Sequence, residues 1–187
     1  MKLISNKYFY GNTGNPKHTD YIVKYLPSDI KLKESYVGNF GDSTDEDLVD
    51  KAQRHSKNAS IAVQNNPFMP LLDTIMRNAN DIIWKLDYKC EWEDEQINYI
   101  VYDEPGAHFL WHSDSYDFVS KDYKDRKLSV SYCLSHASDY EGGEFCIEDK
   151  EFHMDYGDFI VFPSQDTEHC IKPLISGVRH VLVGFSC

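Results

Sequence analysis

The sequence has no Cys-x-x-Cys pair, no long apolar run and few basic side chains. Its five cysteines are widely spaced and odd in number, which is typical of reduced, mostly buried thiols and not of a disulfide framework. No segment approaches the ~18–20 continuous apolar residues of a membrane span, and the first residues lack the apolar stretch of a secretory signal. We therefore expect a soluble, cytoplasmic protein without a membrane partner.

Basic side chains are outnumbered, because 19 Lys and Arg stand against 31 Asp and Glu, for a formal net charge of −12 at pH 7. Binding to phosphate backbones depends on Lys and Arg, so this balance argues against a nucleic-acid partner. Solubility alone accounts for an acidic surface. Aromatic residues, in contrast, make up 14% of the chain, which favours a strand-rich fold.

The pattern of the chain changes near residue 95. Before it, helical spacing and capping signals predict helices over residues 45–55 and 70–79. After it, short apolar segments between Gly and Asp turns predict strands over residues 97–102, 127–134, 144–147, 159–162 and 178–185. With 187 residues and no linker, we expect one α+β domain. Residues 1–95 would supply supporting helices and flanking strands, and residues 96–187 a double-stranded β-helix, or jelly-roll, core.

Two histidines and one carboxylate are the strongest candidates for a metal site. In an extended strand His112 and Asp114 project to one side, while Ser113 points away. If His169 arrives from another strand, the three form a two-histidine, one-carboxylate set that suits iron(II) oxygenases. The same ligands can also hold zinc. An isolated His-x-Asp is more often structural or surface-exposed. The prediction of a metal site therefore depends on the order of the motifs and on their strand context.

Arg179 follows His169 by ten residues, with Gly177 between them. If the chain turns near residue 174, the two residues lie roughly opposite each other on neighbouring strands. The guanidinium could then reach beyond the metal and bind the far end of a dicarboxylic acid through two parallel hydrogen bonds. Taken alone, Arg179 would most simply belong to a salt bridge.

From about Tyr99 to the C-terminus the sequence resembles the prolyl 4-hydroxylase-like branch of the 2-oxoglutarate/iron(II) oxygenases, in particular its bacterial and phage members. The resemblance rests on residues 102–114, 126–134 and 142–145, and on Gly157, Asp158, Phe162, Pro163, His169, Pro173, Gly177 and Arg179. One departure is Ser135, where many relatives carry Asn. The first ninety residues match the family only vaguely, and we expect part of substrate recognition to be encoded there.

The iron(II) ligands implied by the resemblance are His112, Asp114 and His169. Arg179 would bind the remote carboxylate of 2-oxoglutarate, Tyr132 would share that carboxylate, and Tyr102 would line the cosubstrate pocket. The related halogenating enzymes lack the carboxylate ligand, so the presence of Asp114 favours hydroxylation.

The implied activity is hydroxylation of a C–H bond with iron(II), 2-oxoglutarate and dioxygen, and ascorbate is a possible addition. Family analogy makes peptidyl proline the first expected target. One alternative is an oxygenase that acts on a free amino acid or another small molecule. An alternative of another class is a non-catalytic jelly-roll module that binds a metal without turning over 2-oxoglutarate.

Several residues near these motifs are expected to have other roles. His108 has the strand parity of His112, but it follows the Gly106 turn, which favours a structural or pocket-wall role. Cys170 should point away from the metal as a buried thiol. Residues 113–125 are interpreted as a loop beside the metal that either closes over substrate or simply connects two strands.

Overall fold

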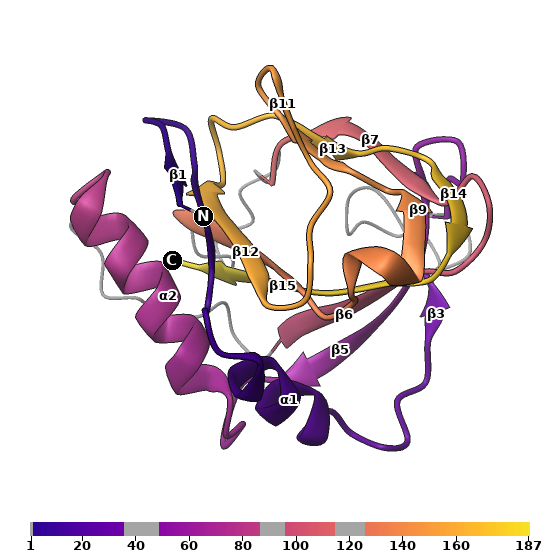
Figure 1. The fold of residues 1–187 in the computed structure, drawn as a ribbon, viewed down its shortest axis with the longest axis horizontal. Coiled ribbons are helices and arrows are strands. Elements are labelled where there is room, and N and C mark those ends of the chain that lie inside the picture. Colours follow the sequence, from indigo (N-terminus) through magenta and orange to yellow (C-terminus); the bar gives the residue numbers. More distant parts are fainter. Residues whose placement is uncertain (1, 36–48, 87–95, 115–125) are drawn as a thin grey trace, which may run out of the picture.

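The computed structural model of the chain describes residues 2–35, 49–86, 96–114 and 126–187. Within these ranges two sheets face each other, and a two-stranded ribbon lies at one end. Both helices lie below and to the left of the larger sheet in Figure 1, whereas the smaller sheet lies above it. The predicted loop over residues 113–125 lies almost entirely outside the described residues.

The larger sheet is antiparallel and carries the site's supporting strands. Its order is β1 (Leu3–Ile4), β2 (Phe9–Asn12), β12 (Asp158–Pro163), β8 (Leu128–Cys133), β15 (Arg179–Ser186), β6 (Gln96–Tyr102), β5 (Lys57–Ala62) and β3 (Lys33–Glu34). Every residue of β8 is buried, because this central strand has packed layers on both faces. Such a strand reads as a continuous apolar and small-residue run.

The smaller sheet holds the two histidines. Its order is β11 (Lys150–Phe152), β10 (Phe145–Ile147), β13 (His169–Ile171), β7 (His108–His112) and β4 (Arg54–His55). The ribbon pairs β14 (Leu174–Gly177) with β9 (Tyr140–Gly142), which follows the short helix η1 (Ala137–Asp139). Apolar side chains from the facing surfaces of both sheets form one core between them. The metal and cosubstrate candidates lie along this inner space.

A second core lies between the larger sheet and the helices. Helix α2 (Met69–Ile82) buries a stripe at helical spacing, namely Leu72, Ile75, Met76 and Ala79, against that sheet. This confirms the helix predicted over residues 70–79. Helix α1 (Pro16–Lys24) was not predicted, although Asn15 caps it by accepting a hydrogen bond from the Lys17 N–H, and Pro16 opens it.

The helix predicted over residues 45–55 is wrong in its described part. Residues 51–53 form a turn, and Arg54–His55 pair with Phe109 and His108 of β7 as strand β4. The Asp50 carboxylate accepts a hydrogen bond from the Ala52 N–H and closes this turn. Pairing with a distant strand therefore outweighs local helix propensity. Residues 45–48 lie outside the described part of the chain.

The jelly-roll prediction is confirmed. Strands β6, β8, β10, β12 and β15 fall on the five predicted segments, with boundaries that agree to within a residue or two. They are divided between two facing antiparallel sheets, as that architecture requires. Neither helix of the described ranges combines the length and apolar character needed to cross a bilayer.

Candidate metal and cosubstrate site

His112 and His169 face each other across neighbouring strands. His112 ends β7 and His169 begins β13, and the two are direct partners in the antiparallel ladder, with ring centroids 4.2 Å apart. The Nε2 atoms of His112 and His169 lie 3.8 Å from Oδ1 and Oδ2 of Asp114, respectively. One ligand atom from each residue falls within 4.8 Å of the others. This brings the three predicted ligands together.

Both imidazole rings direct Nε2 toward the Asp114 carboxylate, because Nδ1 of each ring is hydrogen-bonded to a backbone carbonyl oxygen. Nδ1 of His112 lies 2.7 Å from the Leu110 carbonyl oxygen, and Nδ1 of His169 lies 3.2 Å from that of Thr167. A carbonyl can only accept, so each Nδ1 carries the hydrogen and each neutral ring keeps its Nε2 lone pair for a metal. Burial, together with the nearby His169, lowers the pKa of His112 to about 4, which keeps this ring neutral at pH 7.

The Asp114 carboxylate fits a cation. Its side chain is only 10% exposed, and Oδ2 is buried without a hydrogen-bond partner among the described residues. A buried carboxylate oxygen without a donor is costly, and a bound cation would remove that cost. Two neutral imidazoles and one carboxylate form the donor set that suits iron(II) with open coordination positions.

A β-bulge decides which side chains share the face of His112. His169 pairs with His112 and Ile171 with Phe109, so two steps along β13 match three along β7. Phe109 therefore stacks on His112, with ring centroids 3.5 Å apart. His108 instead lies within 2.7 Å and 3.0 Å of the carbonyl oxygens of Gly106 and Ala52, which agrees with the predicted structural role.

The backbone of Asp114 is held on both sides. Its N–H donates to the Ser164 carbonyl at 3.0 Å, and its own carbonyl accepts from Nη1 of Arg126 at 3.3 Å. The Arg126 guanidinium lies over the Phe185 ring, 3.6 Å from the centroid. These contacts tie the carboxylate ligand to β12 and β15 of the larger sheet.

Arg179 is among the largest fully buried side chains of the described residues. It opens β15 opposite Tyr102 of β6, whose ring centroid lies 5.5 Å from its Cζ. Nη2 donates to the Met154 sulfur at 3.7 Å, while Nε and Nη1 have no hydrogen-bond partner among the described residues. A buried cation with two unused donors is a matching site for a carboxylate. The predicted placement of Arg179 opposite His169 on a neighbouring strand is wrong, because Arg179 pairs with Tyr102 in the larger sheet whereas His169 belongs to the smaller one.

The structure contradicts the role predicted for Tyr132. Strand partners share a face, so Cys133, opposite Val181, lies on the face of Arg179, while Tyr132, opposite Leu182, lies on the other. The Tyr132 hydroxyl is 2.7 Å from Oγ1 of Thr19, on the helix side of the sheet. Tyr132 is therefore a core residue under α1 and does not approach Arg179.

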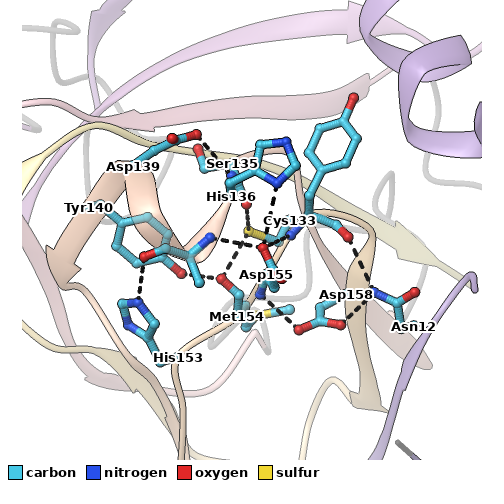
Figure 2. Close-up of polar contacts among 12 residues, drawn as sticks. Asn12, Cys133, Ser135, His136, Asp139, Tyr140, His153, Met154, Asp155 and Asp158 are labelled. Carbon is cyan, nitrogen blue, oxygen red and sulfur yellow. Dashed lines mark hydrogen bonds and ion pairs between the residues drawn. The ribbon is translucent and has the colours of Figure 1, made fainter. Parts of the chain in front are cut away.

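Tyr140 is the phenol that the sequence did not single out. It begins β9, is 5% exposed, and its hydroxyl donates to the Met154 carbonyl at 2.5 Å, as Figure 2 shows. Burial raises the pKa of Tyr140 to about 12, while the nearby Arg179 guanidinium acts in the opposite direction. The only sequence signal is its place just before Gly142 and Gly143, both of which have positive φ.

Comparisons with known proteins agree with this geometry. Residues 97–186 match the model of the 2OG-Fe(II) oxygenase superfamily. A PKHD-type hydroxylase of Synechococcus sp. (strain CC9902) is 38% identical over 86 residues, which are 44% of this chain and 37% of that protein. This match confirms the resemblance of residues 97–186 to the 2OG-Fe(II) oxygenase superfamily. The chain spans little more than a third of the length of this curated relative.

Solved structures extend the likeness of fold beyond these residues. A prolyl hydroxylase from Trichoplax adhaerens, solved with a peptide of the hypoxia inducible factor oxygen degradation domain, has a TM-score of 0.67 and 16% identity. The alignment covers 97% of this chain and 84% of that one. A prolyl-4-hydroxylase of Pseudomonas putida has a TM-score of 0.65 and 17% identity, over 96% and 91% of the two chains. At these identities the match concerns the fold.

Proposed function

We propose that this protein is an iron(II)- and 2-oxoglutarate-dependent dioxygenase that hydroxylates a C–H bond, with peptidyl proline as the first expected target. The observation that carries the proposal is the presence of two sites between the facing sheets: a two-histidine, one-carboxylate set, and a fully buried arginine with two donors that have no partner among the described residues. A purely structural metal needs no such cation nearby. The fold relatives that are prolyl hydroxylases support the choice of target by analogy alone.

Different residues would bind the metal and the cosubstrate. His112, Asp114 and His169 would hold iron(II), and Arg179 would bind the far carboxylate of 2-oxoglutarate, with Tyr102 as a wall of that pocket. Bound iron(II), 2-oxoglutarate and dioxygen supply the oxidising chemistry, and ascorbate would serve as an accessory reductant. The protein fixes the imidazole tautomers, neutralises the cosubstrate charge and keeps water from the buried pocket.

A reducing compartment is the expected setting. Cys146 of β10 and Cys170 of β13 are direct strand partners, yet both are free thiols, as are Cys133 and Cys187. Cytoplasmic thiol pools keep such neighbouring pairs reduced. We therefore propose a cytoplasmic location for the enzyme.

The cosubstrate assignment is tested by anaerobic reconstitution with iron(II), followed by titration with 2-oxoglutarate and detection of the visible metal-to-ligand charge-transfer band. We expect a saturable band, its loss in His112→Ala, and a shift to 10²–10³-fold higher ligand concentration (about 3–5 kcal/mol) in Arg179→Ala. Arg77→Ala, on the exposed face of α2, serves as the matched control and should titrate like the parent protein. An iron-loaded protein without a band would instead favour the non-catalytic metal-binding module.

The substrate class is tested separately by measuring succinate formation in air. Proline-containing peptides should stimulate it, with a mass increase of one oxygen atom on the peptide. Stimulation by free amino acids or other small metabolites alone would favour the small-molecule oxygenase and contradict a peptidyl target.

A further inference from the structure

The inner face around Arg179 has an unusual composition for a carboxylate site. Cys133, and not a tyrosine, stands on β8 at the position that faces Arg179, because Tyr132 is turned toward Thr19. A thiol is a weak hydrogen-bond donor, so β8 supplies little help to a bound carboxylate. A phenol near Arg179 must therefore come from a strand other than β8, and besides Tyr102 of β6 the fold provides a second one.

Tyr140 supplies that second phenol from β9, on the ribbon at the end of the two sheets. Its hydroxyl donates to the Met154 carbonyl oxygen at 2.5 Å, and the sulfur of the same Met154 accepts from Nη2 of Arg179 at 3.7 Å. Met154 is fully buried and thus links the phenol and the guanidinium through two different atoms. The Tyr140 ring also lies against His153, with centroids 4.6 Å apart, which restricts its rotation (Figure 2).

A hydrogen-bond count assigns Tyr140 its role. A phenol has one proton and can also accept, and the proton of Tyr140 is used by Met154. Its oxygen keeps its lone pairs beside the Arg179 guanidinium, and Nε and Nη1 of Arg179 have no hydrogen-bond partner among the described residues. Gly143 leaves space for this arrangement, since an added Cβ would lie 3.3 Å from Cδ of Arg179.

We propose that Tyr140, together with Met154, is a positioning residue that holds the Arg179 guanidinium for the far carboxylate of the cosubstrate, in place of a tyrosine on β8. The inference rests on the proposed function, because it concerns how the same cosubstrate is bound. Tyr140 orients a buried cation that would otherwise have few polar contacts, and so favours the one arrangement in which two donors face the ligand.

The test compares two ligands that differ only at the far end. The iron(II) protein is titrated anaerobically with 2-oxoglutarate and with 2-oxovalerate, which has the same carbon chain but no far carboxylate. Loss of a neutral hydrogen bond, such as that from Tyr140 to the Met154 carbonyl, typically weakens an interaction by roughly twofold to tenfold. We expect Tyr140→Phe to raise the Kd for 2-oxoglutarate severalfold, up to about tenfold, and to leave the Kd for 2-oxovalerate within twofold.

Tyr132→Phe is the matched control, since it removes a buried phenolic oxygen on the opposite face of the same sheet. It should lower the thermal unfolding midpoint and leave both dissociation constants unchanged. Three results would overturn the inference: equal weakening for both ligands, no weakening in Tyr140→Phe, or selective weakening in Tyr132→Phe. Failure of the proposed function is a separate result, because the parent protein itself would then show no saturable band.

Discussion

The ring of Phe109 stacks on that of His112 with centroids 3.5 Å apart, although the two residues are three positions apart on one strand. In a regular strand they would project to opposite faces. The bulge in β7 removes this difference and leaves Leu110 and Trp111 exposed between them. The aromatic support of one metal ligand thus depends on an extra residue in the strand.

Replacing Phe109 by alanine should weaken metal binding by about tenfold, since residues that orient a ligand typically contribute 10–100-fold to affinity. The His112 ring would keep its Leu110 hydrogen bond but lose the surface that fixes its plane. Competition with a chelator under anaerobic conditions measures the change. Leu110→Ala, on the exposed side of the bulge, should leave the affinity unchanged; an equal loss there would mean that the bulge itself, and not the stack, matters.

Removing the Asp114 carboxylate should have opposite effects on the metal-free and metal-loaded proteins. Asp114→Ala deletes a buried oxygen that has no hydrogen-bond partner within the described ranges, so the metal-free variant should unfold at the same temperature as the parent or higher. Metal-induced stabilisation, which is about 2.7 kcal/mol when the metal is at 100 times its Kd, should largely disappear. Thermal scans with and without metal measure both effects. A large loss of stability without metal would contradict this account of Asp114.

Gly143 offers a test of the space beside Arg179. Gly143→Ala places a methyl group 3.3 Å from Cδ of Arg179 at φ +65°, whereas Gly14→Ala has a similar φ of +70° and nothing within 4 Å. Both changes should cost about 1–2 kcal/mol of stability through the backbone conformation. Only Gly143→Ala should also weaken 2-oxoglutarate binding, by severalfold in the charge-transfer titration. Equal binding in both variants would show that Arg179 tolerates displacement.

The metal-free protein should lose stability between pH 6.5 and about 4. His112 takes up a proton near pH 6.5 in the unfolded chain, whereas burial lowers its pKa in the folded chain to about 4. The unfolded state therefore binds more protons in this window, and the free energy of unfolding falls as the pH decreases. The contribution is roughly 3 kcal/mol at most, and it levels off below pH 4.

NMR titration of the imidazole resonances in the metal-free protein measures this pKa directly. His18, which is exposed on α1, serves as an internal reference in the same spectra. A His112 pKa near 6.5 would contradict the buried, neutral ring that the site requires. In His112→Phe, the loss of stability between pH 6.5 and 4 should be smaller than in the parent protein.

The sequence predicted correctly those helices and strands whose signals lie within a single segment. The apolar stripe of α2 and the apolar segments of β6, β8, β12 and β15 were predictable from local sequence, because their side chains fill the two cores on either side of the larger sheet. The set of His112, Asp114 and His169 was also predictable, since only one residue separates two of its members in the sequence and the order of motifs supplied the third. Strand β4 was not predictable, because its residues gain their partner only when β7 lies beside them.

The sequence by itself determined the residues that can bind a metal and a dicarboxylate, because those functions depend on side-chain chemistry. Only the tertiary structure decided which face each one occupies. The bulge in β7 places Phe109 behind His112, and the register of β8 against β15 turns Tyr132 away and puts Cys133 on the face of Arg179. Tyr140 comes close to Arg179 from β9 of the two-stranded ribbon. The physical reason is the two-residue period of a strand: a shift of one residue exchanges its faces, and that shift is set by pairing between distant segments.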